Sequence, residues 1–72
     1  MRLYANHGGN SGIVSYEYGD NYISVQFSTG NIYTYSYESA GKSNIEHMKM
    51  LADSGSGLNS FIMKNVRTIY EK

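Results

Sequence analysis

Residues 22–36 decide the fold of this chain, and their sequence is YISVQFSTGNIYTYS. Ile23, Val25 and Phe27 occupy every second position, with Ser24 and Gln26 between them. This alternation is typical of a strand that buries one face and leaves the other to water. A second alternating run, rich in tyrosine, follows the glycine at position 30. The stretch therefore predicts a β-hairpin.

The turn of this hairpin allows two lengths, and they place the tyrosines on different faces. A two-residue loop at Thr29-Gly30 pairs Phe27 with Ile32 and sends the next tyrosines to the face opposite Phe27. With that loop, the tyrosines at positions 22, 33, 35 and 37 line an open sheet face, a stacking platform of the kind that readers of single-stranded RNA use.

A three-residue loop over 28–30, with its glycine in the left-handed conformation, pairs Val25 with Tyr33 and Ile23 with Tyr35. We favour this loop because it places five large side chains on one face, where they can form a core. A slip of one residue would exchange the whole set between the two faces.

A strand before the hairpin and two helices after it complete the expected fold. Val14 and Tyr16 share the period of a strand, and the Gly19-Asp20-Asn21 turn leads from them into the hairpin. Ser43 and Glu46 form a capping-box pattern, so we expect a helix that begins there and ends near Gly55.

A second short helix is expected from Leu58, Phe61 and Ile62, which recur at helical spacing. Residues 65–70 alternate again, and they either add an edge strand or pack their apolar residues over a helix. The fold class is therefore α+β, a three-stranded antiparallel meander with two short helices on one face. The expected core comprises Val14, Tyr16, Ile23, Val25, Phe27, Tyr33, Tyr35, Ile45, Met48, Leu51, Leu58, Phe61 and Ile62.

The length of 72 residues and the composition predict one small domain. Residues 13–72 form this domain, and the glycine-rich residues 1–12 are expected to be a flexible lead-in. The chain has no cysteine to stabilise a modest core with a disulfide. No apolar run approaches the roughly 20 residues that span a bilayer, and the N-terminus lacks the apolar segment of a signal peptide. We therefore expect a cytoplasmic protein without a membrane segment.

The order of these motifs resembles the KTSC domain, a small module at the C-terminus of some lysyl-tRNA synthetases that also occurs as a stand-alone protein in bacteria and phages. The resemblance runs from about Ser11 to Tyr70 and rests on Val14-x-Tyr16, Ile23-x-Val25-x-Phe27, Gly30-x2-Tyr33-x-Tyr35 and Asn65-Val66-Arg67-x2-Tyr70. The family has no established activity. Its synthetase context implies RNA, either tRNA or a single strand, as a partner.

Charge gives limited support to this implication. The formal net charge is zero, which argues against strong sequence-independent binding to phosphates. However, residues 58–72 contain three basic residues against one acidic residue, whereas residues 1–57 contain three against five. An arginine near an aromatic ring suits phosphate contact and base stacking. The predicted RNA-binding residues are therefore Lys64, Arg67, Tyr70 and Lys72.

Two other hypotheses compete with RNA binding. Arg67 can instead cover the sheet edge with its aliphatic stem and cap a backbone carbonyl. The protein can also be an interaction module, for a protein partner or for itself, that uses a sheet edge or an apolar strip with Met50 or Met63.

No catalytic centre is expected. His7 and His47 have no serine, cysteine or carboxylate at a spacing that predicts a triad or a metal site. The Ser54-Gly55-Ser56-Gly57 segment lacks the lysine and the spacing of a phosphate-binding loop, so it is expected to link the two helices. The sequence thus predicts a non-catalytic module with no cofactor and no metal.

Overall fold

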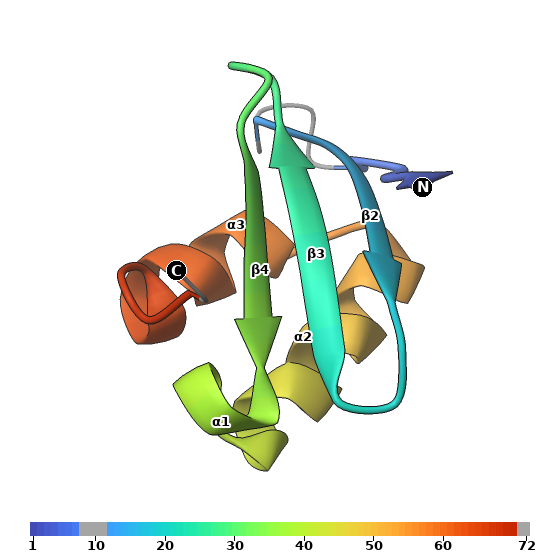
Figure 1. Cartoon of the computed structure of the whole chain (residues 1–72). Helices are drawn as coiled ribbons and strands as arrows, with labels where there is room; N and C mark the ends of the chain where they lie inside the picture. The colour runs from blue at the N-terminus through green and yellow to red at the C-terminus, as the bar shows by residue number, and fades with distance from the viewer. Residues whose placement is uncertain (8–11, 71–72) are drawn as a thin grey trace.

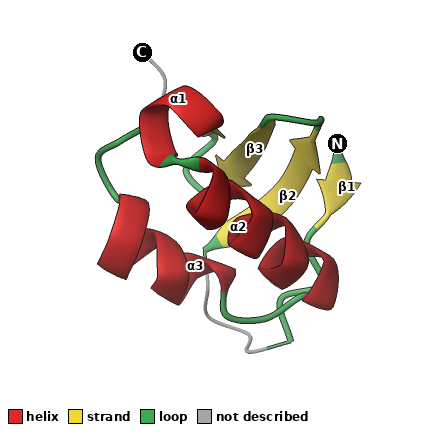
Figure 2. Cartoon of the chain, turned by 90° about the horizontal axis from the view of Figure 1, so that it is seen from below, coloured by secondary structure: helices red, strands yellow, loops and turns green. Residues whose placement is uncertain are grey.

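The computed structural model describes residues 1–7 and 12–70, and it consists of an antiparallel sheet with helices on one face (Figures 1 and 2). The strands lie in the order β1-β2-β3-β4, which is also their order along the chain. The α+β class is confirmed. The elements are β1 (Arg2–Leu3), β2 (Ile13–Tyr18), β3 (Tyr22–Phe27), β4 (Ile32–Ser36), α1 (Tyr37–Ala40), α2 (Lys42–Ser54), α3 (Leu58–Phe61) and the π-helical turn η1 (Ile62–Val66).

The hairpin of β3 and β4 has the register that the three-residue loop predicts. Val25 pairs with Tyr33 and Ile23 pairs with Tyr35. Gly30 has a φ of 95°, and its amide donates to the Phe27 carbonyl. A residue with a Cβ adopts this left-handed conformation only at a cost, which is why glycine specifies the loop. The tyrosines of β4 therefore share the helix-covered face with the apolar residues of β3.

The sheet has four strands, not the three expected. Arg2 and Leu3 pair with Tyr16 and Ser15 of β2 and form the additional outer strand β1. Tyr4 follows β1 and is buried, and its hydroxyl accepts a hydrogen bond from the Leu58 amide at 3.3 Å. Residues 2–4 thus belong to the sheet and core, in contrast to the expected lead-in over 1–12, of which residues 8–11 lie outside the described residues.

A bulge in β2 corrects one predicted core residue. Ile13 pairs with Phe27 and Ser15 pairs with Gln26, so Val14 is an extra residue without a partner in β3. The bulge shifts the alternation, and Ile13 enters the core instead of Val14, which is 41% exposed.

The predicted capping box is wrong in position. Helix α2 begins at Lys42 after Gly41, and no side chain caps it. A capping box does occur one helix earlier, where Ser36 and Ser39 exchange side-chain and backbone hydrogen bonds at the start of α1. Glu46 instead accepts from Lys49 and from the Tyr37 hydroxyl. The end of α2 is as predicted, with Gly55 in the left-handed conformation.

The C-terminal segment adds no edge strand in the described residues. The chain remains helical through Val66, because α3 continues directly into η1. Tyr70 then packs its ring against Tyr33 and Tyr35 of the sheet. The alternation in the sequence of residues 65–70 therefore reflects packing of this tail on the sheet tyrosines.

The core lies between the sheet and the helices, and the outer sheet face carries no helix (Figure 2). Phe27, Tyr33, Leu51 and Phe61 are partly buried at its margin, as is Tyr70. Among the residues that the structure describes, no helix has the length and apolar character to cross a membrane. The buried hydrophobic residues are Tyr4, Ile13, Tyr16, Ile23, Val25, Tyr35, Ala40, Ile45, Met48, Ala52, Leu58, Ile62 and Val66.

Candidate functional site

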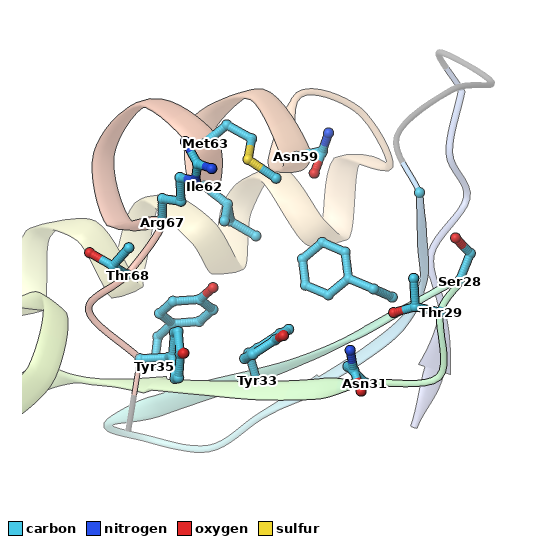
Figure 3. A pocket seen from close by; sticks show the side chains of 13 residues that line it. Ser28, Thr29, Asn31, Tyr33, Tyr35, Asn59, Ile62, Met63, Arg67 and Thr68 are labelled. Atoms are coloured by element: carbon cyan, nitrogen blue, oxygen red, sulfur yellow. The ribbon is translucent and has the colours of Figure 1, made fainter. Parts of the chain in front are cut away.

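A pocket of about 500 Å³ opens between the end of the β3–β4 hairpin and the last helical segment (Figure 3). Its volume is in the range of sites for small ligands. One wall comes from the sheet, the other from residues 59–68, and Tyr70 of the tail completes it. The lining residues are Gly12, Phe27, Ser28, Thr29, Asn31, Tyr33, Tyr35, Asn59, Ile62, Met63, Arg67, Thr68 and Tyr70.

The sheet wall of this pocket is aromatic. Phe27 and Tyr33 contact each other edge to face, with ring centroids 5.7 Å apart. Tyr70 lies 4.7 Å from Tyr33 and 6.3 Å from Tyr35, measured between ring centroids. The register of β3 and β4 causes this arrangement, because it directs these side chains to the helix-covered face. The result is a continuous set of π-faces and edges on which a planar group can pack.

The helical wall comes from α3, from the π-helical turn η1 and from the residues that follow it. Asn59, Met63 and Arg67 recur every fourth residue and all line the pocket. Figure 3 shows Ile62, Met63 and Arg67 above the tyrosines of β4. Single π-helical turns often occur at functional sites.

Among the described residues that line the pocket, Arg67 is the only charged one, and its charge is positive. No ion pair or hydrogen bond from another described residue engages its guanidinium, and the residue is exposed. Tyr35 is 1% exposed, and this burial, with smaller effects of Tyr33 and Tyr70, raises its pKa to about 12. The described lining thus combines aromatic rings with one guanidinium, and this combination suits an anionic ligand with a planar ring.

The structure brings only some of the predicted RNA-binding residues together. Arg67 and Tyr70 both line the pocket. Lys64 is exposed on η1, three residues before Arg67, and does not line the pocket. Lys72 lies outside the described residues. The sequence did not indicate Asn31 or the tyrosines of β4 as neighbours of Arg67, because they lie more than thirty residues before it and no local pattern connects the two segments.

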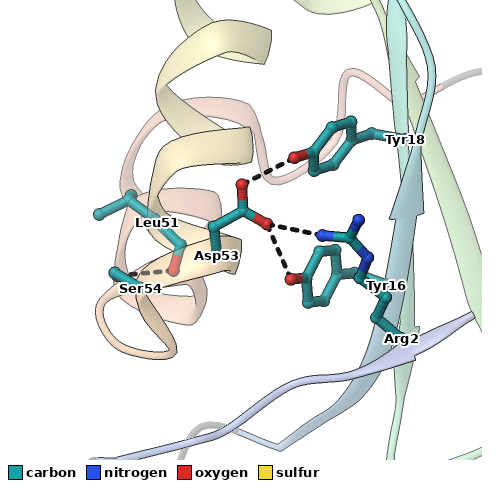
Figure 4. A network of polar contacts seen from close by, with 6 residues as sticks. All are labelled: Arg2, Tyr16, Tyr18, Leu51, Asp53 and Ser54. Carbon is teal, nitrogen blue, oxygen red and sulfur yellow. Dashed lines mark hydrogen bonds and ion pairs between the residues drawn. The ribbon is translucent and has the colours of Figure 1, made fainter.

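Apart from the pocket, a polar cluster surrounds Asp53 near the end of α2 (Figure 4). Its carboxylate accepts from the Tyr18 hydroxyl at 2.7 Å and from the Tyr16 hydroxyl at 2.8 Å. Arg2 lies 3.5 Å from the same carboxylate. The hydrogen bond from Tyr18, and to a smaller extent the one from Tyr16, lowers the pKa of Asp53. The cluster ties β1 and β2 to α2, and its groups satisfy one another, so its role is structural.

The two histidines lie outside the pocket and outside the Asp53 cluster. The ring of His47 packs on Phe61 at a centroid distance of 4.5 Å, and the backbone amide of His7 donates to Gly55. Within the described part of the chain, no group of three or more histidine, cysteine or carboxylate side chains is placed to hold a metal ion.

Comparison with known proteins gives no relative: no family model, no curated protein and no solved structure matches the chain. The resemblance to the KTSC domain therefore stays a prediction from the motifs in the sequence.

Proposed function

We propose that the protein is a non-catalytic module that binds single-stranded RNA, with one unpaired base in the aromatic pocket and its phosphate at Arg67. The observation that carries the proposal is the convergence of Arg67 and Tyr70 with Tyr33 in one pocket of about 500 Å³. Recognition of single-stranded RNA relies on bases that stack on aromatic rings and on cations that contact the backbone.

Charge sets the expected strength of this binding. The chain has zero net charge, but the described residues that line the pocket include no carboxylate. Arg67 and Lys64 lie three residues apart on one helical segment and can contact adjacent phosphates. Each phosphate contact with a single strand contributes a slope of about −0.7 in log K against log salt, so two contacts give about −1.4. We therefore expect moderate affinity that weakens with salt and depends on the base.

A titration of labelled RNA by fluorescence anisotropy tests this proposal. The probes are an eight-residue oligouridine, an eight-residue oligoadenosine and a tRNA, each at low and raised salt. Arg67→Gln should weaken binding at least tenfold, since a charge-assisted hydrogen bond contributes about 1.5–3 kcal/mol. Lys42→Gln is the matched control, because it removes the same charge from the start of α2, outside the pocket lining.

Circular dichroism establishes that each variant is folded. Equal loss of affinity in Arg67→Gln and Lys42→Gln would mean that only overall charge matters and would contradict a specific site. Absence of binding at low salt to all three probes would exclude the RNA function.

A protein-interaction module is the second candidate function. The exposed Met50 on α2 and Met63 on η1, at 62% and 51%, favour it, and so does the outer edge of β4, which is considered below. Sedimentation over a range of protein concentrations tests the self-associating form. A dimer that is lost in Met50→Ser would support it, and a monomer at high concentration would exclude it.

A further inference from the structure

Strand β4 is an outer strand of the sheet, and half of its backbone groups face away from β3. The Phe27 amide donates to the Asn31 carbonyl, and the Tyr37 amide donates to the Asn21 carbonyl. These two bonds bracket the paired region, so the odd-numbered residues of β4 bond to β3. Because antiparallel strands alternate in this way, the amides and carbonyls of Ile32 and Thr34 point to the free edge.

Nothing in the described residues covers or blocks this edge by hydrogen bonding. The Ser36 amide donates to the Ser39 side chain, but no backbone hydrogen bond from another described segment reaches the outward groups of Ile32 or Thr34. Strand β4 also has no charged residue, no proline and no bulge against β3. Natural proteins commonly protect an edge strand by one of these devices. An edge without them is suited to accept a further strand.

The last helical segment limits which strand can be accepted. Figure 1 shows that the last helical segment, coloured orange to red, runs behind β4 and that its later part projects past the edge of the sheet. A second copy that paired through its own β4 would extend the sheet with its helices on the same side. Its projecting segment would then occupy the same space as the first. A single strand without attached helices avoids this collision, so a peptide fits the edge better than a second copy does.

The pocket supplies the side-chain recognition for such a strand. Residues of an added strand point alternately to the two faces of the sheet. Those on the helix side would lie beside Tyr33, Met63 and Thr68, which line the mouth of the pocket. Arg67 is exposed and is the single charged residue among the described residues that line the pocket. An apolar or aromatic side chain followed two residues later by a carboxylate matches these surroundings.

We propose that the β4 edge binds an extended peptide segment by strand addition, with an apolar or aromatic side chain in the pocket and an acidic group at Arg67. This inference is independent of the RNA function. It adds one consequence to it, because a peptide on β4 covers the mouth of the same pocket and competes with RNA.

Selection from a phage-displayed library of random decapeptides against the immobilised protein supplies the probe. We expect enriched sequences in which apolar residues alternate with others and a carboxylate lies two positions from an aromatic or large aliphatic residue. The best sequence is then synthesised and added to the isotope-labelled protein for amide hydrogen exchange by nuclear magnetic resonance. At a peptide concentration of a hundred times Kd, exchange at Ile32 and Thr34 should slow by about a hundredfold.

A matched pair of variants tests the same contact. Thr34→Pro removes the outward amide without removing a bond to β3, a position at which an edge strand tolerates proline. Thr34→Val keeps the amide, and both variants lose the hydrogen bond between the Thr34 and Ser24 hydroxyls. We expect Thr34→Pro to weaken peptide binding at least tenfold relative to Thr34→Val. If Thr34→Pro does not fold, the exchange measurement alone decides.

Three outcomes would overturn the proposal. The first is a selection without enrichment, and the second is a peptide that binds without slowing exchange at Ile32 and Thr34. The third is protection of these amides by the protein itself at high concentration, with a dimer in sedimentation. Oligouridine bound in the pocket should not protect the two amides, so failure of strand addition and failure of the RNA function are distinguishable.

Discussion

The hydrogen bond between Tyr4 and Leu58 gives the sharpest test of how the N-terminal segment belongs to the fold. Tyr4 is 6% exposed and Leu58 is fully buried. The Leu58 amide is at the start of α3, where Gly57 provides no side-chain cap, and it donates to the Tyr4 hydroxyl at 3.3 Å. Tyr4→Phe removes the acceptor, retains the ring and leaves this amide unpaired in the core.

The expected loss of stability follows from this geometry. A buried donor without a partner costs about 1–3 kcal/mol. A chain of 72 residues has a total free energy of unfolding of about 4–11 kcal/mol. Tyr4→Phe should therefore remove a large fraction of the stability, and the melting temperature should fall by about 4–8 °C for each kcal/mol. Tyr4→Ala also removes a buried ring, at a cost of about 3–5 kcal/mol, which can unfold the protein.

Urea denaturation followed by circular dichroism measures the effect. Tyr22→Phe is the control, because Tyr22 is half-buried in β3 and no hydrogen bond of its hydroxyl is seen. We expect its stability to change by less than about 0.5 kcal/mol. Equal urea midpoints for Tyr4→Phe and Tyr22→Phe would refute the view that the Tyr4 hydroxyl caps α3.

Three further predictions concern protonation and the turn. The pKa of Asp53 is lowered in the folded state from its ordinary 3.8. Its contribution to stability is therefore complete above that pH and is lost as the pH falls through the folded pKa. When urea midpoints are measured from about pH 7 to pH 2, the midpoint of Asp53→Asn should fall less than that of the natural protein. Burial raises the pKa of Tyr35 from 10.0 to about 12. The stabilisation by its neutral phenol is therefore full below pH 10 and is lost as the pH rises towards 12. An absorbance titration of Tyr35→Phe should lack the most alkaline tyrosine step of the natural protein, and an unchanged titration would contradict the assignment. In Gly30→Ala the added Cβ meets no atom within 4 Å, but the alanine must adopt a φ of 95°. This backbone conformation should lower the free energy of unfolding by about 1–2 kcal/mol, and Gly30→Asn should lower it less. Equal thermal stability of Gly30→Ala and the natural protein would contradict the loop geometry.

The hairpin could be predicted because its determinants are local. Period-two alternation and one glycine specify the loop over 28–30 and the pairing of Val25 with Tyr33. The bulge at Val14 has no such marker, since any residue can be the extra one in β2. The two-residue strand β1 depends on pairing with β2 and on burial of Tyr4, which are contacts with distant parts of the chain.

Only part of the candidate site could be predicted from the sequence. Arg67 and Tyr70 are neighbours in the chain, so their pairing of a cation with a ring was visible. Their convergence with Tyr33 depends on where η1 lies relative to the sheet, which periodicity does not determine. At residues 65–70 the alternation left two alternatives open, an edge strand or packing of apolar residues, and the structure has a helical turn up to Val66 followed by Tyr70 packed on the sheet tyrosines.

The order of the strands has a consequence for the rate of folding. Each strand pairs with its neighbour in the sequence, so the sheet can assemble through a series of short loop closures. The contact between Tyr4 and Leu58 spans 54 residues and closes the largest loop. If the meander forms in the transition state and this contact forms afterwards, Tyr4→Phe speeds unfolding and leaves the folding rate almost unchanged. The N-terminal segment then determines how long the molecule stays folded, and the hairpins determine how fast it folds.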